Sequence, residues 1–374
     1  MSLVLYRKYR PQTFKEIVGQ KHIVQTLTNA LLKGMVSHAY LFAGPRGTGK
    51  TTVARLLAKA VNCENRKENE SSAFEPCNKC SSCLEIMAGR SLDLIEIDAA
   101  SHRGIDEIRE LKDGIKFSPV KSKYKVFIID ESHQLTKEAA NALLKTLEEP
   151  PSHAIFVLAT TEIHKMIPTI ISRCQRFDFR KLTIPEIIKR LEGIVKKEGA
   201  KIEKAALELI ALNSGGAIRD AESLLDQALT FASAYNRELK ATDIKDLLGL
   251  VEVETVGEFT DFLCQKKVKE AIDFLNEITD KGLDLQEFSV SLINYLRQAL
   301  ILKIVGDDQS SENSIVSGLT KEELEKLKKQ SAVFKEEELQ KIINLFLDAS
   351  NKMKYSPIPQ LPLELAIIEA CGIA

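Results

Sequence analysis

The sequence predicts an α/β domain with a parallel sheet, followed by two helical domains. In the first 180 residues, short apolar segments typical of strands alternate with amphipathic segments typical of helices. This alternation indicates a parallel sheet with helices on both faces. After about residue 180 the strand signals stop and only helical periodicity remains. A glycine-rich segment, GPRGTGKT, follows the first predicted strand and opens a helix.

Five short apolar runs are expected to form the strands of the sheet, at 39–44, 92–98, 124–130, 153–160 and 174–179. Between them lie segments with apolar residues at helical spacing, at 21–34, 50–61 and 138–149. The last of these helices is expected to end at Pro150 and Pro151, because proline cannot continue a helix.

The rest of the chain reads as helices separated by glycines and polar loops. The first group covers 183–234, and the second contains 255–264, 268–282, 285–305 and 337–353. The most polar, loop-like stretch is GDDQSSENSIVSG. We therefore expect three domains, which are an α/β domain at 1–180 with a cysteine-rich insert at about 62–88, a small helical domain at 181–244, and a helical domain at 245–374.

Composition limits the classes of function that fit this chain. It has 374 residues and a formal net charge of −1, so no basic excess points to nucleic acid. A DNA contact would need a local patch. No run approaches the roughly 20 apolar residues that cross a bilayer, and the N-terminus lacks the long apolar core of a signal peptide. We expect a cytoplasmic protein without a membrane partner.

The glycine-rich segment fits the P-loop pattern G-x-x-x-x-G-K-[ST] in the strand-to-helix context that the pattern requires. Its backbone N–H groups would surround phosphate oxygens at the start of a helix. Lys50 would reach the β- and γ-phosphates, and Thr51 would bind Mg²⁺. The alternative is a glycine-rich turn without a ligand. The expected nucleotide-binding residues are Gly44, Pro45, Arg46, Gly47, Thr48, Gly49, Lys50, Thr51 and Thr52.

Polar side chains follow two later strands of the predicted sheet. VFIIDE ends a strand with two carboxylates, of which Asp130 would complete the Mg²⁺ shell and Glu131 would polarise the attacking water. The alternative is an acidic pair that caps the next helix. VLATT ends the following strand, so Thr160 and Thr161 are expected at the edge of the sheet where ligands bind, in contact with the attacking water or the γ-phosphate.

Arg219 lies near the start of a helix in the second domain. From that position it could fold over the nucleotide and couple domain closure to the γ-phosphate. The alternative is a solvated surface charge.

Together these features resemble the AAA+ ATPases. The segments YRKYRPQTFKEIVGQ, LLKTLEEPP, LATT and ISRC are similar to those of the clamp-loader branch. The resemblance implies that 181–244 is a lid domain, that 245–374 is an oligomerising collar, and that ATP binds between adjacent subunits. It also implies that Arg173 reaches the γ-phosphate of the neighbouring subunit as a catalytic arginine finger. The alternative is that Arg173 pairs with a nearby carboxylate such as Asp178.

The same resemblance implies a biological role. The chain would be an ATP-hydrolysing motor subunit that opens a sliding clamp and loads it onto primer–template DNA for a replicative polymerase. Its partners would be further copies of itself, the δ and δ′ subunits, the sliding clamp and DNA. A branch-migration helicase motor and a structural clamp-loader subunit without ATPase activity are the alternative functions.

Four of the seven cysteines are clustered, at Cys63, Cys77, Cys80 and Cys83. In a reducing compartment, such clustering points to a metal. Four thiolates suit a closed tetrahedral Zn²⁺ site, and a [4Fe–4S] cluster is the alternative for C-x₂-C-x₂-C spacing. The family resemblance implies structural zinc. Cys174, Cys264 and Cys371 are scattered and are expected to be buried apolar residues.

One segment, AASHRGIDEIRELKD, is the expected DNA contact. Arg103 and the helix N-terminus beside it would hold a backbone phosphate. The alternative is an ordinary surface helix.

Overall fold

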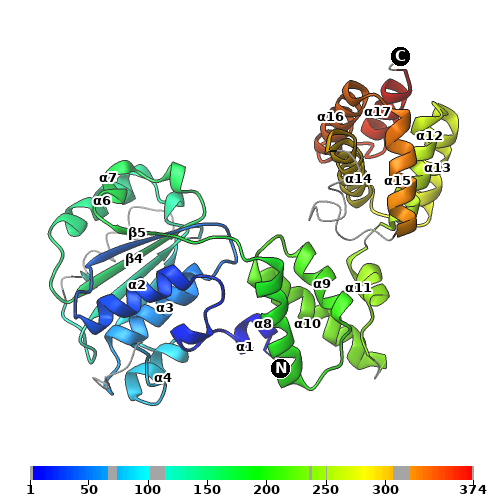
Figure 1. Ribbon diagram of the computed structural model, residues 1–374. Helices are drawn as coiled ribbons and strands as arrows, with labels where there is room; N and C mark the ends of the chain where they lie inside the picture. The colour runs from blue at the N-terminus through cyan, green and yellow to red at the C-terminus, as the bar shows by residue number, and fades with distance from the viewer. Residues whose placement is uncertain are drawn as a thin grey trace. The chain divides into compact units, whose positions relative to one another are not determined.

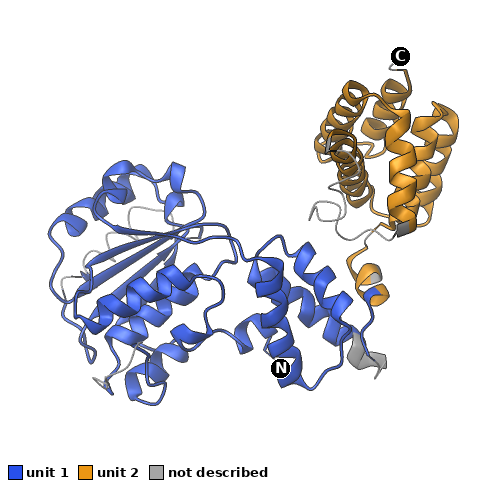
Figure 2. Cartoon of the chain, in the orientation of Figure 1, with its two compact units in different colours: residues 1–241 blue, residues 242–374 orange. Residues whose placement is uncertain are grey.

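The computed structural model describes residues 3–65, 74–101, 114–115, 117–235, 238–249, 251–305 and 321–372. The chain forms two compact units, residues 1–241 and 242–374 (Figure 2). The first unit contains the sheet and a group of helices that follows it, and the second is helical. Within the described ranges, no helix is long and apolar enough to cross a membrane.

The first unit is built on a five-stranded parallel sheet with the order β2-β3-β4-β1-β5 (Figure 1). The strands are β1 Ala39–Ala43, β2 Leu94–Asp98, β3 Lys125–Asp130, β4 Ala154–Thr160 and β5 Gln175–Asp178. The three central strands are apolar along nearly their whole length, because both faces of the sheet are covered.

Helices pack on both faces of this sheet (Figure 1). The side chains of Tyr40 and Phe42 share a core with α2 and α3, whereas Leu41 between them belongs to the core under α6 and α7. This alternation follows from the two-residue period of a strand. The helices and turns that precede β5 in the chain are α1 Leu5–Lys8, η1 Phe14–Glu16, α2 Lys21–Leu32, α3 Lys50–Val61, α4 Ser81–Met87, η2 Ser132–Gln134, α6 Lys137–Glu148, η3 Ile163–Lys165 and α7 Pro168–Ile171. Of these, α1 lies against the later helix α10 Ile218–Tyr235 and not on the sheet.

The strand register places the carboxyl ends of the strands side by side. Ala43, which precedes the P-loop, is paired with Thr160, and Asp98 is paired with Asp130. Strand β4 lies between β1 and β3, so its end separates the P-loop from the acidic end of β3. Ligands of parallel sheets bind at this edge.

The helices that follow the sheet in the first unit are α8 Ile184–Glu198, α9 Lys204–Asn213 and α10 Ile218–Tyr235. Helix α11 Ala241–Leu248 begins at the last residue of the first unit and otherwise belongs to the second. A capping box between Thr183 and Glu186 starts α8, and Gly199 in the left-handed conformation ends it. Gln20 is fully buried and donates to the Arg180 carbonyl at 2.8 Å. This bond joins the sheet domain to the segment that leads into α8.

The second unit is a helical domain with its own apolar core, centred on residues such as Phe259, Phe288 and Phe346. Its helices are α12 Val253–Cys264, α13 Val268–Asp280, α14 Leu285–Val305, α15 Lys321–Val333, α16 Glu336–Met353 and α17 Leu361–Gly372. The ring of Phe259 contacts those of Phe288 and Phe346 edge-on, at centroid distances of 5.1 and 6.1 Å.

The structure confirms the predicted fold class, including all five parallel strands and the helical character of the rest. The three-domain division at 180 and 244 stays a prediction. The polar stretch GDDQSSENSIVSG lies outside the described residues.

One buried polar network crosses the second unit. Gln330 is 4% exposed, accepts from the Tyr295 hydroxyl at 2.7 Å, and donates to the Gly257 carbonyl at 2.7 Å and to Asp261 at 2.5 Å. This single side chain therefore links α14, α15 and α12.

Replacing Gln330 with Leu should destabilise the second unit by about 2–3 kcal/mol, because it leaves the buried Tyr295 hydroxyl without its partner. Tyr295→Phe removes one bond only and should cost about 1 kcal/mol. Hydrogen exchange of α12, α14 and α15 measures both effects. Unchanged protection in Gln330→Leu would show that the network does not stabilise the unit.

Candidate active site

The segment between β1 and α3 has the geometry of a phosphate-binding loop. Gly44 and Gly47 have φ values of 148° and 76°. A Cβ at Gly44 would lie 2.3 Å from the Phe179 carbonyl, and one at Gly47 would lie 2.8 Å from the Cβ of Ala217. Both positions therefore require glycine. The loop packs against the end of β5 on one side and the start of α10 on the other.

Lys50 begins α3 and is 6% exposed. Its Nζ donates to the carbonyls of Gly44 at 2.7 Å and Pro45 at 2.9 Å. Burial lowers the pKa of Lys50, while the charges of Glu131 and Asp130 act in the opposite direction. The ammonium group is thus held inside its own loop, next to two carboxylates.

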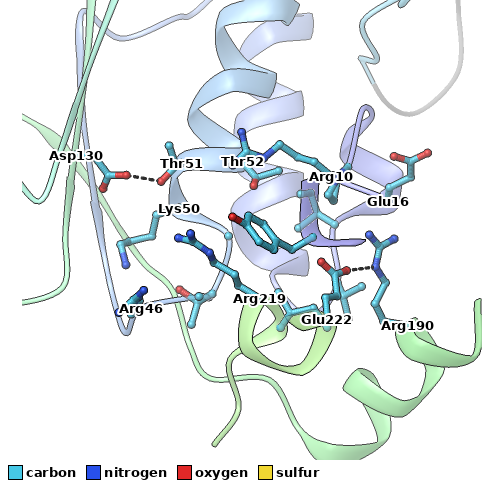
Figure 3. Close-up of a pocket in the computed structure, with 18 of the residues that line it drawn as sticks. Arg10, Glu16, Arg46, Lys50, Thr51, Thr52, Asp130, Arg190, Arg219 and Glu222 are labelled. Carbon is cyan, nitrogen blue, oxygen red and sulfur yellow. Dashed lines mark hydrogen bonds and ion pairs between the residues drawn. The ribbon is translucent and has the colours of Figure 1, made fainter. Parts of the chain in front are cut away.

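Thr51 and Asp130 are in direct contact. The Thr51 hydroxyl donates to Asp130 Oδ2 at 2.6 Å (Figure 3). Two oxygens bound to adjacent positions of one octahedral Mg²⁺ lie about 3.0 Å apart, because each metal–oxygen distance is about 2.1 Å. The hydroxyl and the carboxylate are therefore close enough to supply two of the oxygen ligands of one Mg²⁺ ion, with phosphate and water supplying the rest.

Glu131 has a left-handed backbone, with a φ of 47°, directly after β3. Its Oε2 accepts from the Thr161 hydroxyl at 2.8 Å and from the Thr161 N–H at 3.3 Å. Thr160 is fully buried, and its hydroxyl lies 3.0 Å from His133 Nδ1. The end of β4 thus holds Glu131 through Thr161, whereas Thr160 faces His133.

A pocket opens beside the P-loop, Asp130 and Glu131, and residues of α10 form another of its walls (Figure 3). The guanidinium of Arg219 lies 4.7 Å from the centre of the Tyr6 ring, a cation–π distance. Glu222 accepts from Arg190 at 2.9 Å within the same wall. Burial raises the pKa of Glu222, and Arg190 opposes this shift.

The N-terminal segment forms the remaining wall, which the site predictions did not include. Its pocket-lining residues are Tyr6, Arg10, Pro11, Glu16, Ile17 and Val18. Several of these are apolar or aromatic, in contrast to the polar P-loop end. The segment YRKYRPQTFKEIVGQ carries the family resemblance, but no spacing rule assigns these residues to a pocket.

The structure gathers most of the predicted nucleotide-binding residues around this pocket. Those that line it are Arg46, Gly47, Thr48, Gly49, Lys50, Thr51, Thr52, Asp130, Glu131 and Arg219. Gly44, Pro45 and Thr161 lie behind the lining in the described structure and contact Lys50 or Glu131, which form part of it. Thr160 is also outside the lining and contacts His133 instead. The predicted DNA contact, Arg103, lies outside the described residues.

Arg173 is not among the residues that line this pocket in the described part of the chain. Its guanidinium contacts Glu148 at 2.5 Å and donates to the Thr169 carbonyl at 2.8 Å. Asp178, the carboxylate named in the alternative, pairs with Arg176 instead. Arg173 therefore does not serve the pocket of its own chain in this conformation.

The four clustered cysteines converge. The sulfur atoms of Cys63, Cys77, Cys80 and Cys83 all lie within 4.8 Å of one another, and those of Cys77 and Cys83 are 4.0 Å apart. Tetrahedral Zn²⁺ with bonds of about 2.3 Å requires sulfurs about 3.8 Å apart, so the four residues fit a structural zinc ion.

The surroundings of Cys77 favour a thiolate. Burial acts to raise its pKa, but the backbone N–H groups of Lys79 and Cys80 lower the pKa of Cys77 to about 6. These N–H groups donate to its sulfur at 3.4 and 3.3 Å. By contrast, burial raises the pKa of Cys174 and of Cys264 to about 12. The Cys174 and Cys264 thiols thus lack the conditions that favour a thiolate at Cys77.

Family models match along the chain in three consecutive parts. Residues 19–183 match a model described as the delta subunit of DNA polymerase III, and residues 186–234 match the ATPase lid domain of a DNA polymerase III clamp loader subunit. Residues 239–374 match domain III of DNA polymerase III subunits gamma and tau.

Three curated relatives align with 98% of this chain. It is 44% identical to DNA polymerase III subunit tau of Bacillus subtilis, of which it spans 63%, and 37% identical to subunit gamma of Buchnera aphidicola, of which it spans 97%. It is 34% identical to subunit tau of Escherichia coli, of which it spans 55%.

Among solved structures, the chain is similar to the RuvB Holliday junction branch migration motor of Thermotoga maritima. The TM-score is 0.48 at 19% identity, over 68% of this chain and 78% of that one. The family models and the relatives, by contrast, are DNA polymerase III proteins and not branch-migration motors. The chain therefore belongs to the gamma/tau family of DNA polymerase III clamp-loader subunits.

Proposed function

We propose that this chain is an ATP-binding and ATP-hydrolysing motor subunit of a clamp loader. In this role it opens a sliding clamp and loads it onto primed DNA. The observation that carries the proposal is the contact between Thr51 and Asp130 beside a buried Lys50. This arrangement suits Mg²⁺-dependent phosphoryl transfer, because an ion held by Thr51 and Asp130 would lie close to Lys50 and to the bound phosphates.

Within this site the P-loop binds the triphosphate. Lys50 leaves its loop carbonyls to contact the β- and γ-phosphates. Thr51 and Asp130 would hold Mg²⁺, which would supply charge neutralisation for the phosphates. The apolar wall of Pro11, Ile17 and Val18 receives the base, because the phosphates occupy the polar end of the pocket.

Glu131 orients and polarises the attacking water. Its carboxylate lines the pocket, and Thr161 holds one oxygen by a hydrogen bond of 2.8 Å. Thr161 thereby connects the end of β4 to the γ-phosphate region. Thr160 contributes through His133, whose Nδ1 lies 3.5 Å from Glu131 Oε2. Arg219 extends from α10 into the same pocket, so closure of the helical lid brings its charge toward the phosphates.

Arg173 acts on the neighbouring subunit. Its position outside the pocket of its own chain supports a role as an arginine finger in trans, and the family resemblance supplies the arrangement of subunits. The proposed partners are other copies of this chain, the δ and δ′ subunits, the sliding clamp and primer–template DNA, which Arg103 contacts. The cysteine cluster holds structural Zn²⁺, and the protein acts in the cytoplasm.

A structural clamp-loader subunit without ATPase activity is the competing function. The intact set of Lys50, Thr51, Asp130 and Glu131 argues against it, since such a subunit has no need for a complete site. Calorimetric titration of the isolated chain with ATP and Mg²⁺ separates the two functions. Absence of binding would favour the structural role.

Glu131→Gln should separate nucleotide binding from hydrolysis. The amide keeps the shape of the side chain but loses the charge that polarises water, so ATP binding should persist while turnover falls by roughly 10²-fold or more. Lys50→Ala is the comparison, because it removes the charge facing the phosphates and should weaken binding itself. Equal loss of ATP binding in both variants would contradict the role of Glu131.

Arg173→Ala should leave ATP binding by the isolated subunit nearly unchanged and strongly reduce hydrolysis in the assembled complex. Arginine fingers contribute roughly 10³–10⁵-fold in rate. Complexes that mix Arg173→Ala and Lys50→Ala subunits provide the test. Activity should persist only at interfaces where an intact Lys50 faces an intact Arg173. Hydrolysis that did not depend on the order of the subunits would exclude action in trans.

Cys80→Ser should lower the zinc content and the melting temperature without lowering the turnover rate at saturating ATP. A closed four-thiolate site has no open position for chemistry, so its contribution is to folding. Elemental analysis, thermal unfolding and steady-state kinetics measure the three quantities. Normal stability with abolished turnover would reassign the cluster as catalytic.

A further inference from the structure

Glu75 connects the cysteine cluster to the N-terminal wall of the pocket. It lies two residues before Cys77, and its two carboxylate oxygens accept from the backbone N–H groups of Phe14 at 2.7 Å and Lys15 at 2.9 Å. These N–H groups open the turn η1, where a helical turn offers no acceptor of its own. One carboxylate therefore satisfies both donors and fixes the start of the turn.

Lys59 makes a second connection between the region of the cluster and the N-terminal segment. It is 2% exposed and lies on α3, four residues before Cys63. Its Nζ donates to the Gln12 side chain at 2.9 Å and to the Gln12 carbonyl at 3.2 Å. A buried ammonium group requires such partners, so these contacts restrict the backbone just before η1.

Apolar packing reinforces the two polar connections. Phe74, next to Glu75, and Phe14 are both buried in the core under α2 and α3, and Ile17 packs against the same core. The residues that follow Phe14 reach the pocket directly, because Glu16, Ile17 and Val18 line it. The cluster and the apolar wall are thus joined through one short segment, residues 12–18.

We propose that the cysteine module, residues 63–65 and 74–87, positions segment 12–18 and thereby sets the affinity of the pocket for the base and ribose of the nucleotide. Metal binding at Cys77 holds Glu75 in register with the N–H groups of η1. The P-loop is held by separate contacts, so the module acts on the base end and not on the phosphate end. This inference rests on the proposed function, since it assigns the base to that wall.

The chain offers a matched control on the same module. Glu64 follows Cys63, and its carboxylate accepts from the Ser81 hydroxyl at 2.6 Å and the Ser82 N–H at 3.1 Å. It stabilises the start of α4 and, among the described residues, is absent from the lining of the pocket. Glu64→Gln therefore removes a carboxylate close to the cluster that takes no part in the contacts of Glu75 and Lys59 with segment 12–18.

The test measures dissociation constants of the full chain for ATP and for inorganic tripolyphosphate, both with Mg²⁺, by calorimetry. Glu75→Gln puts an amide donor against a backbone N–H, so ATP affinity should fall roughly tenfold. Tripolyphosphate has no base, so its affinity should stay within about twofold of the unsubstituted chain. Glu64→Gln should change neither value, and Cys80→Ser should reproduce Glu75→Gln with reduced zinc content.

Several outcomes would overturn the inference. Unchanged ATP affinity in Glu75→Gln, or an equal loss of affinity for ATP and tripolyphosphate, would show that the module does not set the affinity for the base. If the unsubstituted chain bound neither ligand, the proposed function itself would fail, which is a distinct result.

A second measurement covers the case in which Glu75→Gln does not fold. Hydrogen exchange of the unsubstituted chain, before and after zinc removal by a chelator, should show faster exchange in segment 12–18 and an unchanged P-loop. Equal exchange in segment 12–18 under both conditions would refute the coupling.

Discussion

The parallel register of β1, β4 and β3 is the constraint on which the site depends. It aligns the carboxyl ends of three strands at one edge, so that the P-loop after Ala43 and the carboxylate of Asp130 come together across the end of β4. The 2.6 Å contact between Thr51 and Asp130 spans 79 residues of sequence. A one-residue slip of β3 would reverse the direction of its side chains and separate this pair.

The pocket around this edge is assembled from parts of the first unit that are far apart in the sequence, including the end of β3 with Asp130 and Glu131. The P-loop supplies the polar end, the N-terminal segment supplies an apolar wall, and α10 supplies Arg219 and Glu222. Gly47 touches Ala217 at the start of α10, and Gln20 holds the segment before α8. A displacement of the lid helices therefore changes the pocket directly, which suits a protein whose proposed work is to convert nucleotide state into domain movement.

Sequence alone predicts the sheet, the P-loop, the acidic strand end and the cysteine cluster, because each depends on local pattern. A strand has a side-chain period of two, and a P-loop has a fixed residue spacing. Both patterns can be recognised in the sequence without knowledge of the tertiary fold. The apolar wall could not be predicted in this way. Tyr6, Pro11 and Val18 become neighbours of the P-loop only through tertiary packing. The contact of Glu75 with η1 likewise depends on where the cysteine-rich insert packs against the core. No spacing of residues in the sequence predicts that position.

The ion pair between Arg173 and Glu148 explains how Arg173 can be proposed to act on a neighbouring subunit without an unpaired charge in the isolated chain. The Arg173 side chain is 32% exposed and that of Glu148 is 49% exposed. Ion pairs with this much solvent contact contribute about 1 kcal/mol or less. Glu148 therefore keeps the guanidinium ordered at low energetic cost in a partly exposed position. A γ-phosphate with its higher charge would compete effectively for the same guanidinium, because charge-assisted bonds between arginine and phosphate are among the strongest in proteins.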